Sequence, residues 1–253
     1  MCLILVAWRS AADFPCVIAA NRDEFHARPA QAAHWWPTQP QILAGRDLQA
    51  GGTWLGMTRN GHFAALTNYR DPQQRRVEAP SRGSLVTAIL QSGATTAETL
   101  RYLRAVGAAY NGFNLLFSDG ERLAIYESMS GVGRELPPGI YGLSNHLLDT
   151  PWPKVQAAKS RLSAALSDLA TPNSALALLR DDELAPDDSL PKTGMSVEWE
   201  RLLSSAFIRS AGYGTRCSSV VRIDRAGHAC FDEWTWDTTG HETGQVKVQF
   251  DLR

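Results

Sequence analysis

The stretch that decides the fold is MCLILVAWRSAADFPCVIAANRDE, residues 1–24. Two short apolar runs, residues 3–8 and 16–20, flank a polar segment that contains Asp and Pro, and this pattern predicts a β-hairpin. With a turn centred near residues 11 and 12, the numbers of paired residues sum to about 23. The thiol of Cys2 is therefore expected opposite about residue 21, beside the polar run 21–24 at the end of an apolar strand.

Two further hairpins are predicted along the chain. Residues 53–58 and 62–67 flank Arg59-Asn60-Gly61, and residues 113–118 and 122–127 flank Asp119-Gly120. Asn-Gly and Asp-Gly favour tight turns between paired strands, because their residues tolerate positive φ. Further strands are expected at residues 215–224, 229–236 and 245–252.

Apolar residues at helical spacing predict helices between these strands. The predicted helices span residues 84–91, 97–106, 154–169, 173–180 and 197–206. Residues 181–194 are acidic and rich in Pro and Ser, which is typical of an exposed, mobile loop. Sheets at both ends of the chain with helices between them predict a layered α+β fold. At 253 residues, one domain spanning residues 1–253 is expected.

Composition excludes several classes of function. The net charge of -1 gives no attraction to nucleic acid or to an anionic membrane. The longest apolar run is far shorter than a bilayer span and follows no basic residues, so we expect a cytoplasmic protein without a membrane span. The 4 cysteines form no C-x-x-C pair and the 6 histidines form no H-E-x-x-H motif, so no metal is expected.

Cys2 has a specific chemical role available to it. Removal of Met1 would leave the thiol on the same residue as a free α-amine, whose pKa is about 8. Nucleophile and general base would then share one residue. An adjacent Asp would orient the amine, and Arg22 would help to keep the sulfur as a thiolate. The alternative is that Cys2 is only a small buried apolar residue.

Two asparagines and one arginine extend this hypothesis. Asn68 and Asn145 each end a predicted strand, where their amides could stabilise an oxyanion, although asparagine also ends strands because it favours turns. Arg216 begins a predicted strand and could pair with Asp23 or with a substrate carboxylate. The alternative for Arg216 is an edge position in solvent.

Six ordered blocks in this chain resemble the NRDE family, also called the Transport and Golgi organisation 2 family. The blocks are Met1-Cys2-Leu3-Ile4, Asn21-Arg22-Asp23-Glu24, Gly51-Gly52-Thr53-Trp54-Leu55-Gly56, Leu66-Thr67-Asn68-Tyr69-Arg70, Leu143-Ser144-Asn145 and Tyr213-Gly214-Thr215-Arg216. They run in order along nearly the whole chain, which makes the resemblance specific.

The resemblance implies an N-terminal-nucleophile (Ntn) hydrolase fold, a four-layer αββα sandwich of two mainly antiparallel sheets. It also implies a distant similarity to cysteine amidases such as bile-salt and penicillin V hydrolases. Carried across, the catalytic roles fall on four residues: Cys2, Asp23, Asn68 and Asn145. The residues predicted to bind substrate lie in the matching blocks and are Asn21, Arg22, Glu24, Trp54 and Arg216.

One position departs from those amidases. They carry an Arg three residues before the strand-end Asp, whereas this chain has Ala20 there and Arg22 next to Asp23. Because side chains alternate along a strand, we expect the move to change the face that the guanidinium occupies. Simple amidase activity is therefore open to question on sequence grounds.

Three functions follow from these observations. The first is a cytosolic cysteine Ntn-type hydrolase that cleaves a linear amide or related acyl bond. The second is a non-catalytic carrier of a hydrophobic ligand such as haem, a lipid or an acyl-CoA, in line with family-level proposals on haem trafficking and lipid homeostasis. Its pocket would use Trp35 and Trp36 in a Pro-rich loop, and His26, His34 or His146 as an axial ligand of haem iron. The third is a scaffold without a ligand. No other cofactor is expected, and nothing in the sequence predicts an oligomeric state.

Overall fold

The computed structural model of the chain describes residues 2–169 and 171–253, without the side chain of residue 168. These residues form two compact units, and each unit is discontinuous in the sequence. The first contains the residues up to Ala27, Pro138–Ser144 and Leu148–Gln249. The second contains Arg28–Pro137, Asn145–Leu147 and Phe250–Arg253. Each unit has its own sheet and its own apolar core.

The first unit is built on a six-stranded sheet, in which β1, β2 and β11 are antiparallel neighbours. In sheet order its strands are β10 (Gly139–Leu143), β1 (Cys2–Trp8), β2 (Cys16–Phe25), β11 (Tyr213–Ile223), β12 (His228–Trp236) and β13 (Glu242–Asp251). Its helices are α3 (Pro153–Ala164), α4 (Pro172–Ala177) and α5 (Val197–Leu202), with the 3₁₀-helices η3 (Leu166–Asp168) and η4 (Asp187–Ser189).

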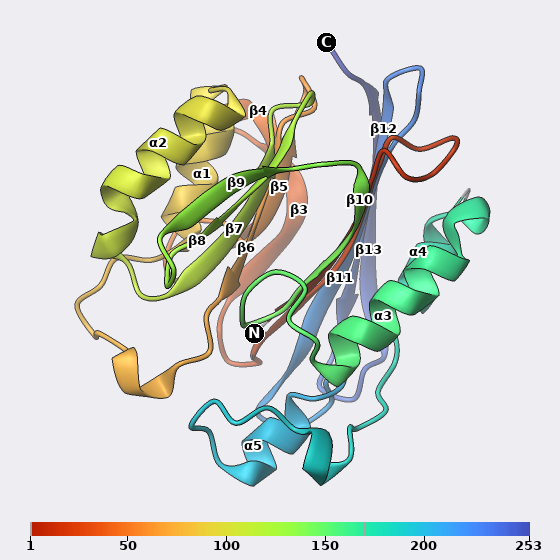
Figure 1. Cartoon of the computed structure of the whole chain (residues 1–253). Coiled ribbons are helices and arrows are strands. Elements are labelled where there is room, and N and C mark those ends of the chain that lie inside the picture. The colour runs from red at the N-terminus through yellow and green to blue at the C-terminus, as the bar shows by residue number, and fades with distance from the viewer. Residues whose placement is uncertain (1, 170) are drawn as a thin grey trace. The chain divides into compact units, whose positions relative to one another are not determined.

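One face of this sheet packs against helices. α3 contacts β10 and β1, and α4 contacts β11 (Figure 1). Alternate strand residues such as Leu3, Leu5 and Val17 form the apolar cluster with Val155 and Leu162 of α3. Since side chains alternate along a strand, Cys2, Ile4 and the other even-numbered residues of β1 lie on the opposite face.

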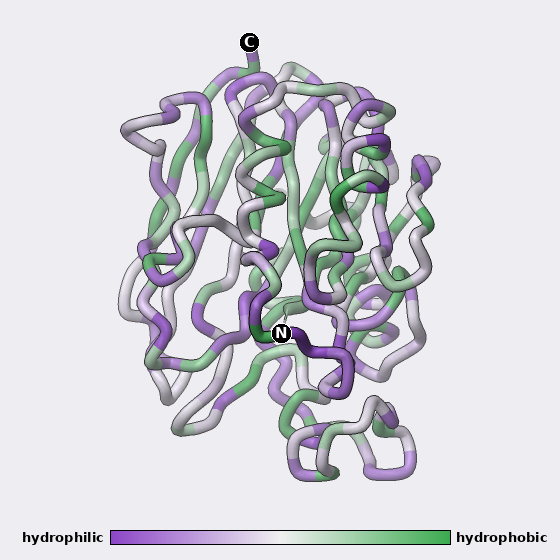
Figure 2. The backbone as a smooth tube through the Cα atoms, turned by 90° about the vertical axis from the view of Figure 1, so that its left-hand side faces the viewer, coloured by the Kyte–Doolittle hydropathy of each residue, from purple (hydrophilic) through white to green (hydrophobic). Residues whose placement is uncertain are grey.

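The second unit is built on a seven-stranded antiparallel sheet of consecutive strands. These are β3 (Ala30–Trp36), β4 (Gln39–Asp47), β5 (Leu55–Thr58), β6 (Phe63–Asn68), β7 (Phe113–Ser118), β8 (Leu123–Glu127) and β9 (Val132–Leu136). Its helices are α1 (Gly83–Ser92) and α2 (Thr96–Val106), with the 3₁₀-helices η1 (Pro72–Gln74) and η2 (Gly107–Ala109). In Figure 2 most of the hydrophobic colour follows the strands, and hydrophilic colour gathers in the connections.

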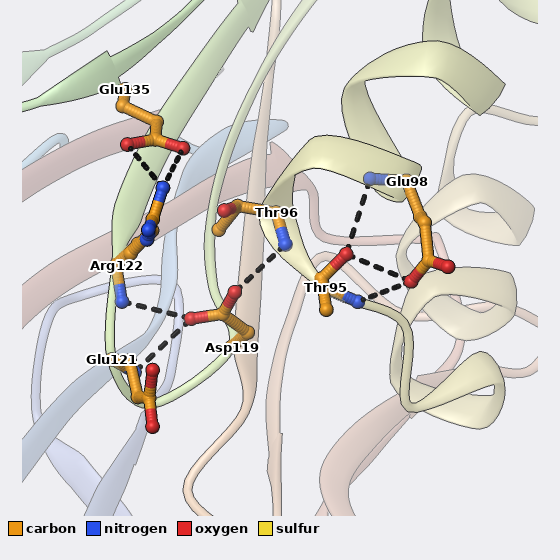
Figure 3. Close-up of polar contacts among 7 residues, drawn as sticks. All are labelled: Thr95, Thr96, Glu98, Asp119, Glu121, Arg122 and Glu135. Atoms are coloured by element: carbon orange, nitrogen blue, oxygen red, sulfur yellow. Dashed lines mark hydrogen bonds and ion pairs between the residues drawn. The ribbon is translucent and has the colours of Figure 1, made fainter.

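Helices α1 and α2 cover one face of this second sheet, α1 on β4 to β6 and α2 on β8 and β9. The N-terminus of α2 carries a capping box, in which Thr95 and Glu98 satisfy each other's backbone N–H groups. The carboxylate of Asp119, from the turn between β7 and β8, accepts a hydrogen bond from the N–H of Thr96 at 2.8 Å (Figure 3). This bond ties the helix to the sheet beneath it.

The structure confirms the predicted fold class, α+β with two mainly antiparallel sheets. The three predicted hairpins are all present, and the strand predicted at residues 113–118 is found with the same bounds. The helix predicted to end at residue 169 is shorter, because α3 stops at Ala164 and is followed by η3.

One prediction about a loop is wrong. Trp35 and Trp36 lie in strand β3, not in a Pro-rich loop, because Pro37 falls in the tight turn before β4. Strand β2 is longer than the predicted residues 16–20, and the polar run 21–24 is part of its end, because β11 supplies backbone partners as far as Phe25.

The acidic segment 181–194 is held by side chains. Asp187 accepts two hydrogen bonds from Arg201, at 2.9 and 2.7 Å, and Glu200 accepts one from the N–H of Thr193 at 3.0 Å. The segment predicted as a mobile loop is therefore fastened to α5.

Candidate functional site

Cys2 begins the first strand, in a row of three side chains on one sheet face. It pairs with Arg22 of β2, and Arg22 pairs in turn with Cys217 of β11. Directly paired residues of antiparallel strands point to the same face, so both thiols flank the guanidinium. Cys2 is 8% exposed, and so is Arg22. The structure thus places a buried thiol beside a buried cation.

The structure gives the exact register that was predicted only approximately. Cys2 lies opposite Arg22, next to the predicted position near residue 21, and the connection from Arg9 to Pro15 closes with the N–H of Arg9 donating to the Pro15 carbonyl at 2.6 Å. A slip of one residue moves every side chain of a strand to the other face. The thiol therefore shares its face with Arg22, while Asn21 lies on the face towards the helices.

The expected consequence of the Ala20 departure was wrong. Ala20 pairs with Ile4 and Arg22 pairs with Cys2, so residues 20 and 22 lie on the same face, one pleat apart. The guanidinium is displaced along β2, not moved across the sheet. The departure from the amidase pattern therefore keeps the positive charge on the face of the thiol.

Asp23 is buried, 1% exposed, and held by β11. Its Oδ1 accepts a hydrogen bond from Thr215 Oγ1 at 2.7 Å, and its carbonyl accepts one from the hydroxyl of Tyr213 at 3.0 Å. Thr215 Oγ1 also accepts from the N–H of Ile208 at 2.9 Å, which fixes its orientation. The backbone N–H of Asp23 donates to the sulfur of Cys2. Asp23 is therefore held in one position beside the thiol of Cys2.

The surroundings of Cys2 keep its thiol protonated near neutral pH. Burial raises the pKa of Cys2, and the negative charge of Asp23 adds to that rise. The positive charge of Arg22 and the hydrogen bond from the Asp23 N–H lower the pKa, but the net direction is upward. A nucleophile in this state needs a base at the moment of attack.

The side chain of Asn21 is fully used in hydrogen bonds within the protein. Its Nδ2 donates to the carbonyls of Leu179 and Ala206, both at 2.8 Å, and its Oδ1 accepts from Ser218 Oγ at 2.6 Å. Both amide hydrogens are thus used to hold the helical layer onto β2. These contacts favour a structural role over the predicted binding of substrate.

Arg216 occupies a β-bulge beside this site. The pairing of β2 with β11 shifts between Thr215 and Cys217, which leaves Arg216 as the extra residue, and bulges of this kind re-aim side chains. Its Nη1 donates to the Phe25 carbonyl at 2.9 Å. Burial lowers the pKa of Arg216, and the nearby charge of Arg22 lowers it further. Glu24 is the acidic neighbour whose charge opposes that shift.

The sequence analysis assigned no role to Cys217 of this row, or to Ser219 and Glu233 beside it. Ser219 Oγ donates to Glu233 Oε2 at 3.1 Å, and the side chains of Glu233 and Cys217 are hydrogen-bonded. Burial and the charge of Glu233 raise the pKa of Cys217 well above its ordinary value. The only sequence signal was the position of Cys217 directly after the Tyr-Gly-Thr-Arg block.

Asn68 and Asn145 lie together in the second unit. Asn145 Nδ2 donates to the Asn68 carbonyl at 2.8 Å, and the N–H of Arg70 donates to the Asn145 carbonyl at 2.7 Å. Asn145 is fully buried. Trp54 belongs to the same unit, where its carbonyl accepts from the N–H of Leu66 at 2.8 Å. The structure thus brings together the two asparagines that were predicted to form one site.

The aromatic and histidine residues considered for haem have protein partners. Trp36 is buried, and its Nε1 donates to the Ala44 carbonyl at 3.0 Å, while the ring of Trp35 packs on Phe250. His34 Nδ1 lies 2.8 Å from the Ala32 carbonyl. The two other histidines also have contacts: His26 Nε2 lies 3.1 Å from the Ser210 carbonyl, and the ring of His146 packs on Tyr69. Haem binding stays a prediction.

Within the described part of the chain, no three His, Cys, Asp or Glu side chains are grouped to hold a metal ion. The described helices include none that is both long and apolar enough to cross a membrane.

Comparisons with known proteins place the chain among relatives. The family model described as Transport and Golgi organisation 2 matches residues 1–238. The Transport and Golgi organization protein 2 homolog of Bos taurus is 39% identical, over 89% of this chain and 91% of that protein. The homolog of Homo sapiens is 36% identical over the same shares. Among solved structures, a Caenorhabditis elegans N-acylethanolamine-hydrolyzing acid amidase ortholog matches with a TM-score of 0.48 and 10% identity, over 86% of this chain and 91% of that one.

Proposed function

We propose that this chain, which belongs to the Transport and Golgi organisation 2 family, is a cysteine hydrolase of the N-terminal-nucleophile type. Its reaction would be the cleavage of a linear amide or related acyl bond, with Cys2 as the nucleophile. The observation that carries this proposal is the environment of the thiol. Cys2 starts β1 beside Arg22, and its sulfur receives the backbone N–H of Asp23.

The base in this proposal is the α-amine of Cys2 after removal of Met1. Because burial keeps the thiol of Cys2 protonated, the thiol must lose its proton as it attacks. The α-amine accepts that proton, so the reaction does not require a preformed thiolate. An α-amine has a pKa of about 8, which suits proton transfer near neutral pH. A cytoplasmic location, which keeps thiols reduced, is part of the proposal.

The reaction proceeds in two balanced halves. The sulfur of Cys2 attacks the carbonyl carbon while its proton passes to the α-amine, which gives a tetrahedral oxyanion. The C–N bond then breaks, the ammonium group protonates the departing amine, and a thioester remains on Cys2. Water attacks the thioester with the amine again as base, releasing the carboxylic acid and the free thiol.

Asp23 and Arg22 take supporting roles in this scheme. The carboxylate of Asp23, whose Oδ1 accepts a hydrogen bond from Thr215, would orient the α-amine. The charge of Arg22 lowers the pKa of the thiol and so assists its deprotonation. The oxyanion roles of Asn68 and Asn145 rest on the family resemblance and stay predictions.

The test is hydrolysis of acyl 4-nitroanilides, with acyl chains from acetyl to dodecanoyl, by protein whose N-terminus has been checked by mass spectrometry. Cys2→Ala should abolish turnover. Cys217→Ala is the matched control, because it removes the thiol on the other side of Arg22 and should leave turnover measurable. Undiminished hydrolysis by Cys2→Ala would refute the proposal.

A further inference from the structure

Two thiols of the first unit flank one guanidinium, and the pairing of the strands does not distinguish them. Cys2 of β1 pairs with Arg22 of β2, and Arg22 pairs in turn with Cys217 of β11. A nearby positive charge stabilises a thiolate, so Arg22 by itself favours ionisation of both thiols. The pairing therefore leaves open which of the two sulfurs is the reactive one.

Access and nearby cations favour Cys217. Cys2 is buried, whereas Cys217 is half-buried and so the more exposed of the two. Arg216, the chain neighbour of Cys217, is a second cation whose charge interacts with this thiol. A partly exposed thiol beside two arginines is the kind of cysteine that is expected to react. A further contact is needed to make Cys2 the nucleophile.

That contact comes from Glu233 of β12, a buried acid that is 3% exposed. Glu233 pairs with Ser219 of β11, two residues along the strand from Cys217, so the three side chains lie on one face of the sheet. Ser219 Oγ donates to Glu233 Oε2 at 3.1 Å, and the side chains of Glu233 and Cys217 are hydrogen-bonded. A buried carboxylate is thus held against the thiol of Cys217.

The hydrogen bonds give the two sulfurs opposite roles. A carboxylate can only accept, so the thiol of Cys217 is a donor to Glu233, which favours the protonated form. The sulfur of Cys2 instead accepts the backbone N–H of Asp23, which favours the thiolate. Both thiols have an acidic neighbour, since the charge of Asp23 acts on Cys2. The direction of the hydrogen bond is therefore what separates them.

We infer that Glu233 is a positioning residue that holds Cys217 as a hydrogen-bond donor and so leaves Cys2 as the reactive thiol beside Arg22. The inference rests on the proposed function for the role of Cys2, and it adds the residue that selects this sulfur over the other. Glu233 acts through Cys217 and forms no bond to the substrate.

The experiment measures alkylation of reduced protein by iodoacetamide between pH 7 and pH 10. Trypsin separates the two thiols, because the peptide of residues 217–222 and the peptide ending at Arg9 each contain one cysteine. In wild type, Cys2 should react faster than Cys217 although it is less exposed. Glu233→Gln keeps an acceptor oxygen but removes the charge. Alkylation of Cys217 at pH 8.5 should then become about threefold faster or more, and its pH profile should move to lower pH.

Two further variants are the controls. Asp232 is the preceding residue and is also buried, but it pairs with Val220 of the apolar cluster under the helices, so it lies on the opposite face. Asp232→Asn should therefore leave the alkylation of Cys217 unchanged. Glu233→Asp keeps the negative charge and should keep Cys217 slow, which a loss of packing alone would not predict.

Each result has a distinct meaning. An unchanged rate and pH profile of Cys217 in folded Glu233→Gln overturn the inference. If Glu233→Gln does not fold, as judged by thermal melting, the order of the two thiols in wild type decides, and faster alkylation of Cys217 overturns the inference. Neither measurement needs turnover, so either failure leaves the proposed function standing. That function fails separately, if Cys2→Ala hydrolyses the anilides undiminished.

Discussion

At the scale of single residues, opposing effects decide the state of Cys2. Burial and Asp23 favour the neutral thiol, and Arg22 favours the thiolate. The register of β1 with β2 places Arg22 on the same face of the sheet as Cys2, where its charge can stabilise the thiolate. The hydrogen-bonding pattern around Asp23 adds a fixed carboxylate, so the local chemistry depends on a few contacts between β1, β2 and β11.

The charge of Arg22 should be measurable through the reactivity of the thiol. Arg22→Gln removes the positive charge, so the pKa of Cys2 rises further and less thiolate is present at a given pH. We expect iodoacetamide to alkylate Cys2 about tenfold more slowly at pH 8.5 in this variant. Peptide mapping measures the alkylation of Cys2 over time. Arg225→Gln, in the turn between β11 and β12, is the control. Equal rates in wild type and Arg22→Gln would contradict the role of Arg22.

A second residue-scale prediction concerns Cys16, whose pKa burial raises to about 12. The folded state then keeps this thiol neutral at pH values where the unfolded chain ionises it. Stability is therefore complete below about pH 8.5 and falls as the pH rises from there towards 12. Between pH 8 and pH 10 in reducing buffer, wild type should lose about 2 kcal/mol more unfolding free energy than Cys16→Ala, as measured by urea titration. An equal loss in both proteins would count against the prediction.

At the scale of elements, the N-terminus of α2 shows how a turn and a helix stabilise each other. Asp119 accepts from the N–H of Thr96 in α2, and from the N–H groups of Glu121 and Arg122 in its own turn, as Figure 3 shows. The capping box of Thr95 and Glu98 satisfies the neighbouring donors. The turn of the β7–β8 hairpin therefore helps to cap the N-terminus of α2, the helix that packs on this sheet.

Asp119→Ala should lower the unfolding free energy at pH 7 by about 1–2 kcal/mol, the usual cost of a lost cap. Burial alone would raise the pKa of Asp119, but the backbone hydrogen bonds lower it overall. Its contribution is therefore present above about pH 4 and lost as the pH falls below that value. The difference between wild type and Asp119→Ala should shrink at pH 3, and exposed Asp13→Ala should show no such difference. A difference that does not change with pH would contradict the ionic cap.

Gly52 marks a close approach of two backbones. A Cβ on Gly52 would lie 2.5 Å from the carbonyl carbon of Gly83, at the start of α1. The clash is with backbone atoms, which cannot rotate away as a flexible side chain can. Gly52→Ala should therefore destabilise the chain by about 1–3 kcal/mol. Gly244→Ala, which meets nothing within 4 Å, should change little in the same urea titration. Similar stabilities for the two variants would show that α1 can shift.

At the scale of the whole molecule, local patterns predicted the elements better than their pairing. Residues 113–118 were predicted well because an apolar run ends at Asp119-Gly120. β3 and β4 were missed because Pro37 and Pro40 were taken as signs of a loop, although one lies in the turn and the other at the start of β4. Alternation of side chains is a local property, whereas membership of a sheet is decided by partners elsewhere in the chain.

The candidate site was predictable in part for the same reason. The hairpin pattern placed Cys2 opposite about residue 21, but the exact pairing with Arg22 could not be predicted, since it depends on the geometry of the loop. The hydrogen bond from Asn114 Nδ2 to the His146 carbonyl could not be predicted, because the two residues lie 32 positions apart in the sequence. The two units are each assembled from separate stretches of chain, so contacts of this kind cannot be deduced from neighbouring residues.

The measurement that tests the nucleophilic role of Cys2 most directly is mass spectrometry of acid-quenched protein during turnover of an acyl 4-nitroanilide. The expected N-terminal peptide begins at Cys2, without Met1, and carries one acyl group in a thioester that hydroxylamine removes. The same adduct should be absent from Cys2→Ala and present in Cys217→Ala. Retention of Met1 in active protein, or an acyl group on any other residue, would contradict it.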